Sequence, residues 1–200
     1  WFRSFGAKTV NAENKPTAAV APAKALPPLQ VQSLYNAMGK QRIKRLSQVF
    51  YDRVYADTEH PEFTSKFNSQ KELVVYAQRT FFMQKFGGER SYGGMSKTDE
   101  TVLTTLHENF VISPEDLVIW LGHMEAAVDE VLSDMDATEA ERVRTTLMDW
   151  FRSFGAKTVN AENKPVAATS GGTGALTRLA IVICCTEVSM SSASDWNEYR

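Results

Sequence analysis

The sequence contains little cysteine. Cys184 and Cys185 are the only two among 200 residues, and they are adjacent. Adjacent cysteines suit neither an ordinary disulfide nor a structural zinc site, which needs about four ligands. Histidine is scarce as well, because only His60, His107 and His123 occur. A lone histidine is usually not a metal ligand, so the surroundings of each one must decide.

Long hydrophobic runs are also absent. The longest, residues 179–185, is far shorter than the roughly 20 residues that cross a bilayer. The sequence does not open with the charged segment, apolar core and small-residue cleavage site of a secretory signal. Lys and Arg number 22 and Asp and Glu number 24, so there is no basic excess for binding nucleic acid. We therefore expect a cytoplasmic protein that binds neither membranes nor nucleic acid.

An internal repeat divides the chain. Residues 1–16, WFRSFGAKTVNAENKP, recur letter for letter as residues 150–165, a separation too long for solenoid units of roughly 20–50 residues. We interpret this as a whole-domain repeat. Residues 1–28 are then the last helix of a preceding unit with an Ala/Pro-rich linker, residues 29–165 form one domain, and residues 166–200 are a linker and a tail of unknown structure. The alternative is that two sequences were joined artificially, and the divergent tail gives that alternative some weight.

Hydrophobic residues recur at helical spacing, and strand alternation is nearly absent. The segments with an apolar stripe along one side are residues 41–55, 70–86, 115–132 and 138–158. Gly39 and the pair Gly87-Gly88 mark helix boundaries, and Asp136 with Glu139 predicts a capping box before the last segment. The sequence therefore predicts an all-α domain.

Polar residues on these stripes are candidate functional residues. Gln78 lies one turn from Val74 and Phe81, where a buried amide without hydrogen-bond partners costs about 1–3 kcal/mol. Tyr51 and Trp120 bring a hydroxyl and an indole N–H into the same apolar interior. Each could simply satisfy a neighbouring backbone group. Together, and with a histidine to face them, they indicate a pocket for a small polar ligand.

The candidate histidine is His107, which opens the segment HENFVISPEDLVIW. A helix should begin shortly after it, because Ser113 can accept from first-turn N–H groups and Pro114 suits the first helical position. Two acidic residues follow, where they favour the positive end of the helix dipole. His107 is therefore held close to a strong helix start.

Four features occur together between residues 34 and 154: FYDRVYAD at 50–57, FFMQKFGGERSY at 81–92, HENFVIS at 107–113, and a tryptophan thirteen residues after His107. In this combination the region resembles the group II truncated haemoglobins. The resemblance implies the shortened globin fold, an all-α two-over-two helical sandwich that encloses haem b, with a long loop leading to the histidine.

The resemblance also implies roles for individual residues. His107 would be the ligand of the haem iron, and Tyr51, Gln78 and Trp120 would form a hydrogen-bonding cluster on the opposite side. The residues implied to contact the haem are Phe67, Phe81, Tyr92, Phe110 and Trp120. Phe63 competes with Phe67 for the position against the porphyrin. His123 is the one rival of His107, because it lies near the same helix face as Trp120.

The sequence departs from the family pattern in several places. Glu89 replaces the proline expected after the double glycine, Leu106 replaces the arginine expected before the iron-binding histidine, and residues 93–103 match poorly. No arginine matches a partner for the haem propionates. The unassigned candidates for that role are Arg79, Lys85 and Arg90.

The implied function is the binding of dioxygen and other diatomic ligands in a polymeric globin. Hydrogen-bond donors near the iron should slow the release of dioxygen, which argues against simple delivery and for redox use. One alternative is therefore an enzyme that converts nitric oxide to nitrate or reduces peroxides. It would need an external reductase, because no Gly-x-Gly-x-x-Gly fingerprint follows a strand. A haem-free helical interaction module is the third hypothesis.

The repeat also predicts protein partners. The first copy would leave Trp1, Phe2 and Phe5 in water, although burying a large apolar side chain is worth roughly 1.5–3 kcal/mol. We therefore expect this segment to pack on a neighbouring globin unit of a tandem array, or to cause self-association.

Overall fold

The computed structural model describes residues 27–161 of the chain, except residues 68, 91, 93–98 and 109. Within these residues, the helices are η1 (Val31–Ser33, a 3-10 helix), α1 (Leu34–Ala56), α2 (Pro61–Thr64), α3 (Lys71–Lys85), α4 (Glu100–His107), α5 (Pro114–Leu132) and α6 (Ala137–Thr158). The described part of the chain has no strand. The predicted all-α fold is therefore confirmed.

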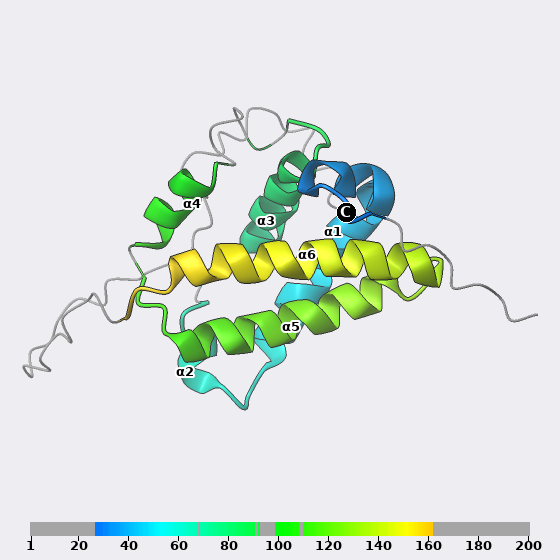
Figure 1. Ribbon diagram of the computed structural model, residues 1–200. Helices are drawn as coiled ribbons and strands as arrows, with labels where there is room; N and C mark the ends of the chain where they lie inside the picture. The colour runs from blue at the N-terminus through cyan, green and yellow to red at the C-terminus, as the bar shows by residue number, and fades with distance from the viewer. Residues whose placement is uncertain (1–26, 68, 91, 93–98, 109, 162–200) are drawn as a thin grey trace, which may run out of the picture.

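The four long helices form two layers. Helices α5 and α6 lie side by side and run in opposite directions, while α1 and α3 cross behind them (Figure 1). The most extensive packing joins α1 to α3, α1 to α5, and α5 to α6. One pair is thus stacked on the other, which is the predicted two-over-two sandwich.

The layers meet in a core built from the hydrophobic stripes. Its largest fully buried side chains are Tyr51, Phe50, Phe86, Phe151, Leu34, Met38, Ile43, Leu46, Leu103, Met124, Leu147 and Met148. Burying side chains of this kind stabilises the fold by roughly 1.5–3 kcal/mol each, more than helix propensity supplies. Trp150 and Phe151 are buried and Phe154 packs against the core, so the second copy of the repeat contributes to this domain. The first copy and residues 162–200 lie outside the described residues.

Helix boundaries follow the predicted signals with one correction. Gly39 adopts a φ of +77° and produces a kink inside α1. At the start of α5, Ser113 and Asp116 form a complete capping box. Asp136 caps α6 by accepting from the N–H groups of Thr138 and Glu139. The reciprocal bond from the Glu139 side chain is not seen among the described residues, so the predicted capping box is only half formed.

Helix α4, which ends at His107, is not among the helices that the sequence predicts. It has only eight residues, and its stability comes from outside the helix. Asp99 caps its first turn by accepting from the Thr101 N–H at 2.8 Å. The Glu100 carboxylate accepts from the indole of Trp150 at 3.1 Å and from Lys157 at 2.6 Å. Both partners lie on α6, so α6 holds α4 in place.

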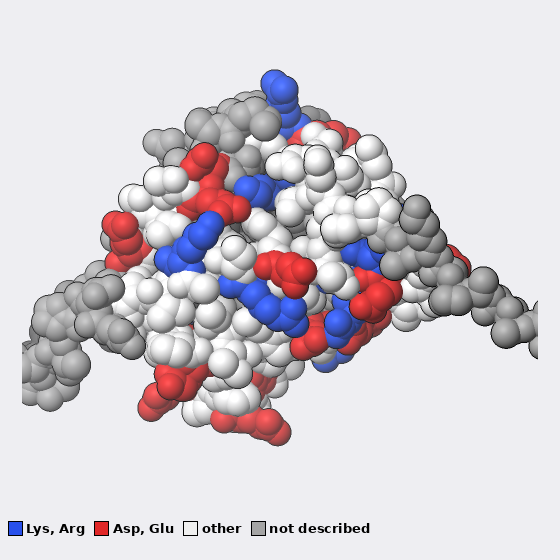
Figure 2. Space-filling model, in the orientation of Figure 1, with Lys and Arg blue, Asp and Glu red and all other residues white. Residues whose placement is uncertain are grey.

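The described surface carries charges of both signs. Acidic and basic side chains are interspersed on the face formed by α5 and α6 (Figure 2). Arg144 on α6, for example, pairs with Asp129 at 2.7 Å and Glu125 at 2.5 Å on α5. Over its described residues, this face presents no continuous basic surface of the kind that binds nucleic acid. Among the described helices, none is long and apolar enough to cross a membrane.

Candidate functional site

A cavity of about 110 Å³ lies among α3, α4, α5 and α6. The predicted site residues that line it are Phe67, Gln78, Phe81, His107 and Trp120. Further aromatic rings come from Phe63, Trp150, Phe151 and Phe154. Residues far apart in the sequence are thus brought to one apolar cavity that contains few polar atoms, which is the usual character of a small-molecule or cofactor site.

The hydrogen bonding and burial of His107 suit a metal ligand. It sits in the last turn of α4, where its Nδ1–H donates to the carbonyl oxygen of Leu103 at 2.6 Å. Burial lowers the pKa of the imidazole, and the bond to Leu103 opposes this effect only in part. The neutral ring is therefore favoured. Because Nδ1 carries the proton, Nε2 has a free lone pair.

The segment that follows His107 is tied to the end of α6. The Asn160 side-chain Nδ2 donates to the carbonyl oxygen of His107 at 3.3 Å, and the Ile112 N–H donates to Asn160 Oδ1 at 3.1 Å. The N–H groups of Asn160 and Ala161 donate to the Ile112 carbonyl at 3.0 and 3.1 Å. Asn160 belongs to the second copy of the repeat, so this copy helps to position the histidine.

Gln78 brings a polar group into the cavity wall from the middle of α3. The residue is only 2% exposed, and its Oε1 has no hydrogen-bond partner among the described residues. Such an atom costs about 1–3 kcal/mol, and most buried polar atoms in proteins have a partner. The side-chain amide offers both an acceptor and donors, so it can satisfy either kind of ligand atom. Gln78 is therefore a candidate ligand-binding residue.

The other two members of the predicted hydrogen-bonding cluster differ in position. Trp120 lines the cavity, with its ring 5.2 Å from that of Phe50 and 5.5 Å from that of Phe151. Tyr51 is fully buried but does not line the cavity, and its ring lies 6.3 Å from that of Phe67. Gln78 and Trp120 are thus in the cavity wall, whereas Tyr51 is buried outside it, near Phe67.

The remaining predicted contact residues surround the cavity at different depths. Phe63 and Phe67 both line it, with ring centroids 4.9 Å apart, so both choices for the position against a porphyrin remain available. Tyr92 packs on Phe81 at 5.4 Å, and Phe110 lies 6.4 Å from His107. Neither Tyr92 nor Phe110 lines the cavity, so each supports a residue that does.

The three candidate partners of the haem propionates, Arg79, Lys85 and Arg90, do not line the cavity. Lys85 pairs with Glu100 at 3.6 Å and lies 5.6 Å from the ring centroid of Trp150. Arg79 stacks on Tyr76, and Arg90 is exposed beside a separate polar cleft that Lys85 also lines. Sequence reasoning missed the cation that does line the cavity.

That cation is Lys66. Its ammonium group pairs with the carboxylate of Asp116, which also lines the cavity, and donates to the carbonyl oxygen of Val111 at 3.2 Å. Burial raises the pKa of Asp116, but hydrogen bonds from Lys66 and Ser113 outweigh this effect and hold the pKa below its usual value. The carboxylate of Asp116 is therefore charged at neutral pH. No local pattern predicts this pair, because the two residues lie 50 positions apart.

The rival histidine, His123, does not line the cavity. Its Nε2 lies 2.8 Å from Oδ2 of Asp57, outside the group of residues around His107. Among the three histidines of the sequence, His107 alone combines a place in the cavity wall with a lone pair that no described group occupies.

The residues present fit a haem in chemistry, although the cavity is narrow. A neutral imidazole, aromatic walls and an amide whose N–H groups can donate to a bound gas suit a haem with a gas-binding iron. The cavity is partly open to solvent, and its volume of about 110 Å³ is below the roughly 300–1,000 Å³ of small-molecule sites. A haem bound here would widen this cavity or extend beyond its opening.

Comparison with known proteins agrees with this architecture. The sequence profile of the bacterial-like globin family matches residues 33–153. A group 2 truncated hemoglobin of Lotus japonicus is 32% identical over 120 residues, which are 60% of this chain and 67% of that protein. The two-on-two hemoglobin-3 of Arabidopsis thaliana is 32% identical over 121 residues, which are 60% of this chain and 65% of that protein.

Two solved structures share the helical arrangement. The hemoglobin of the thermophilic phototrophic bacterium Chloroflexus aurantiacus has a TM-score of 0.52 at 29% identity, over 64% of this chain and 98% of that one. The truncated oxygen-avid haemoglobin of Bacillus subtilis has a TM-score of 0.52 at 24% identity, over 64% of this chain and 99% of that one. The span matched by the family profile contains His107 and every other predicted site residue.

Proposed function

Because this chain belongs to the bacterial-like globin family, we propose that it binds haem through His107 and takes up dioxygen and other diatomic ligands beside Gln78 and Trp120. Membership of the family implies a haem cofactor and a diatomic ligand. The choice of His107 rests on one observation. It is the histidine of the cavity wall, and its Nδ1–H is engaged by Leu103, which leaves Nε2 as the ligand atom.

On the side of the iron ligand, the proposed function depends on the orientation of the His107 ring. A haem held here by His107 would supply an iron that can bind a diatomic gas. The bond from Nδ1–H to the Leu103 carbonyl fixes the tautomer and the ring orientation, and it makes Nε2 a more basic ligand. Asn160, just beyond the end of α6, donates to the backbone carbonyl of His107. The aromatic wall excludes water, which strengthens each polar interaction inside.

On the opposite side, where the diatomic ligand would bind, the proposed function depends on hydrogen bonds to that ligand. Gln78 and Trp120 would supply an amide and an indole N–H at the cavity wall, and Tyr51 lies outside that wall with its ring 6.3 Å from that of Phe67. A hydrogen bond to a charged or strongly polarised group is worth about 1.5–3 kcal/mol. At 1.36 kcal/mol per factor of ten, one such donor slows the release of dioxygen by roughly ten- to a hundredfold. We therefore propose a globin that retains oxygen rather than delivering it.

Slow release also supports an enzymatic alternative. A globin that retains dioxygen suits the conversion of nitric oxide to nitrate, and the same site suits peroxide reduction. Each continued turnover would need electrons from an external reductase. A single addition of nitric oxide to the oxygen-loaded protein should give nitrate once without a reductase, and repeatedly with a reductase and NADH. Nitrate formation that stops after one turnover with every reductase tested would leave ligand binding as the function.

Titration of the purified chain with haem tests the proposal itself. A 1:1 complex with an intense Soret band should form, and the pyridine haemochrome spectrum should identify haem b. The sequence has no Cys-x-x-Cys-His motif for covalent attachment, so acid extraction should remove the haem. A chain that acquires no Soret band would instead support the haem-free interaction module.

The polymeric arrangement is a separate proposal, and it rests on the repeat. Trp150, Phe151 and Asn160 in the second copy pack within this domain or bond to it, so an identical first copy has the residues to do the same for another unit. We propose that the first copy belongs to a preceding globin of a tandem array. Deleting residues 1–26, which keeps the Pro27 carbonyl that accepts from Arg142 at 3.1 Å, should leave the thermal stability of the domain unchanged and abolish any self-association seen by light scattering. A loss of stability as large as that from deleting residues 150–165 would contradict this division of the chain.

A further inference from the structure

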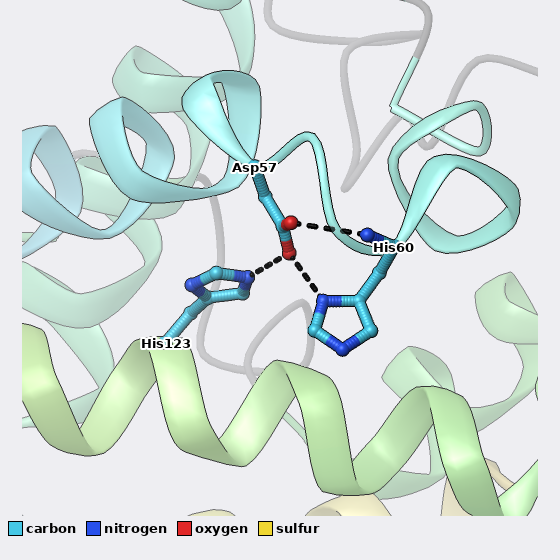
Figure 3. A group of neighbouring side chains, drawn as sticks. All are labelled: Asp57, His60 and His123. Carbon is cyan, nitrogen blue, oxygen red and sulfur yellow. Dashed lines mark hydrogen bonds and ion pairs between the residues drawn. The ribbon is translucent and has the colours of Figure 1, made fainter.

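A second group of potential metal ligands lies away from the cavity wall. Asp57 follows the last residue of α1, His60 precedes α2, and His123 belongs to α5. Figure 3 shows the carboxylate of Asp57 directed between the two imidazole rings. Its Oδ2 lies 2.8 Å from His60 Nδ1 and 2.8 Å from His123 Nε2. One potential ligand atom from each residue lies within 4.8 Å of the others.

The carboxylate is held in this orientation through its other oxygen. Asp57 Oδ1 accepts from the backbone N–H of Glu59 at 2.8 Å and from that of His60 at 3.1 Å. Oδ2 is thereby left to face the imidazoles. Supporting hydrogen bonds of this kind orient carboxylate ligands in metal sites. The ring of His123 is supported in turn by Phe63, which stacks on it at 6.0 Å.

The three side chains differ in exposure in a way that suits a site open on one side. Asp57 is 5% exposed, His123 19% and His60 43%. The anion therefore lies at the base of the group, and the most exposed histidine lies at its edge. An ion can approach past His60, and a water molecule can reach it there.

We propose that Asp57, His60 and His123 bind a divalent transition-metal ion, Zn²⁺ in the first instance, with water as the fourth ligand. Two imidazole nitrogens and a carboxylate oxygen form a donor set of zinc sites that keep one position open. Zinc–ligand distances of about 2.0–2.2 Å in a tetrahedron place the ligand atoms about 3.3 Å apart. The two N···O distances of 2.8 Å need to lengthen by only a few tenths of an ångström, and the two nitrogens approach each other from at most 4.8 Å.

Binding the ion requires a change of tautomer. In the present arrangement each ring directs the same nitrogen toward Asp57 Oδ2 that would coordinate the ion. That nitrogen must offer a lone pair, so it gives up its proton, and the ring's other nitrogen carries the N–H instead. The two hydrogen bonds to Oδ2 break, and bonds from Oδ2 and the two nitrogens to the ion replace them and the waters that the ion sheds.

The bound ion would join three helices. Asp57 and His123 lie 66 residues apart, so the ion would tie the end of α1 and the start of α2 to the middle of α5. Phe63 both stacks on His123 and lines the cavity of His107. The ion would therefore restrain one wall of the candidate haem cavity without being part of it. The proposal does not depend on haem binding.

Calorimetric titration with Zn²⁺ tests this assignment in the purified chain without added haem, with Cys184→Ser and Cys185→Ser so that thiols do not bind the ion. One ion should bind per chain, and Co²⁺ in its place should give the visible absorption of a four-coordinate site. Asp57→Asn, His60→Gln and His123→Gln should each weaken Zn²⁺ binding by more than the roughly 10- to 100-fold caused by loss of a supporting residue.

Matched variants separate a specific site from general effects. Asp134→Asn makes the same change at an exposed carboxylate that pairs with Arg42, and it should leave the Zn²⁺ affinity unchanged. His60→Gln changes the most exposed ligand, so an unaltered thermal transition should show that this variant is folded. Absence of stoichiometric Zn²⁺ binding would overturn the proposal and leave the group as a hydrogen-bonded tie between helices. A Zn²⁺ affinity equal to the parent's in all three ligand variants would overturn it as well.

Discussion

Replacing Gln78 by leucine should move stability and ligand retention in opposite directions. In the haem-free protein the amide is 2% exposed, and its Oε1 lacks a partner among the described residues. Leucine fills a similar volume without a polar atom. The haem-free variant should therefore be more stable than the parent, whereas the haem-loaded variant should lose a hydrogen-bond donor to the diatomic ligand.

The sizes of the stability change and of the change in oxygen release both follow from the Gln78 amide. An unsatisfied buried polar atom costs about 1–3 kcal/mol, so Gln78→Leu should raise the free energy of unfolding by up to that amount. For a domain of this size, such a gain raises Tm by several degrees. Losing one hydrogen bond of about 1.5–3 kcal/mol should speed the release of oxygen at least tenfold.

Gln84 provides a matched control on the same helix. It is 4% exposed, but its Oε1 accepts from the buried N–H of Tyr92 at 3.2 Å. Gln84→Leu removes that hydrogen bond and should therefore lower the free energy of unfolding by about 0.5–1.5 kcal/mol. Because Gln84 does not line the cavity of His107, oxygen release should stay at the parent rate.

Urea unfolding of the haem-free proteins and stopped-flow oxygen release from the haem-loaded proteins measure the two effects. The reasoning is refuted if Gln78→Leu is destabilised like Gln84→Leu and releases oxygen at the parent rate. That result would mean that Gln78 is a structural amide with a partner in the folded protein.

Three further predictions address the cavity, the backbone and the response to acid. Trp120→Phe removes the indole N–H but keeps an aromatic ring, so stopped-flow oxygen release should accelerate severalfold; an unchanged rate would show that the indole only packs. Gly87→Ala should lower the free energy of unfolding by well over 2 kcal/mol, because φ is +92° and a Cβ would lie 1.9 Å from the Gln32 carbonyl oxygen. A loss within the roughly 1–2 kcal/mol of a positive φ alone would contradict that close approach. The pKa of Asp116 is lowered although burial alone would raise it, because hydrogen bonds, first that from Lys66, outweigh burial. Its contribution to stability is therefore complete above the usual value of 3.8 and is lost as pH falls through the lower folded pKa, so Asp116→Asn should flatten the acid unfolding curve. An unchanged curve would assign the acid sensitivity to other carboxylates.

The long helices could be predicted from the sequence because each buries a continuous hydrophobic stripe. The stripes predicted residues 41–55, 70–86, 115–132 and 138–158, and these segments coincide closely with parts or all of α1, α3, α5 and α6. Helix α4 has too few residues to show a stripe of its own. Its Glu100 is held by Trp150 and Lys157, which lie 50 and 57 residues away. Contacts at that separation leave no local pattern in the sequence.

The candidate site could be predicted only in part for the same reason. Sequence motifs identified His107, Gln78 and Trp120, and the fold brings all three to one cavity. A sequence motif does not show where a side chain lies relative to a cavity, so the motifs did not show that Tyr51 is outside the cavity wall. The motifs also gave no sign that His123 and Asp57 are neighbours, because only the packing of α5 against the end of α1 brings these residues together.

Replacement of His107 by glycine, with and without added imidazole, tests the central claim most directly. The variant should lose haem during desalting, because no other described histidine lines the cavity. Free imidazole should restore the Soret band by entering the space of the missing ring, and His123→Gly should retain haem without imidazole. Haem that stays bound to His107→Gly without imidazole, or is lost from His123→Gly, would contradict the assignment of His107 as the iron ligand.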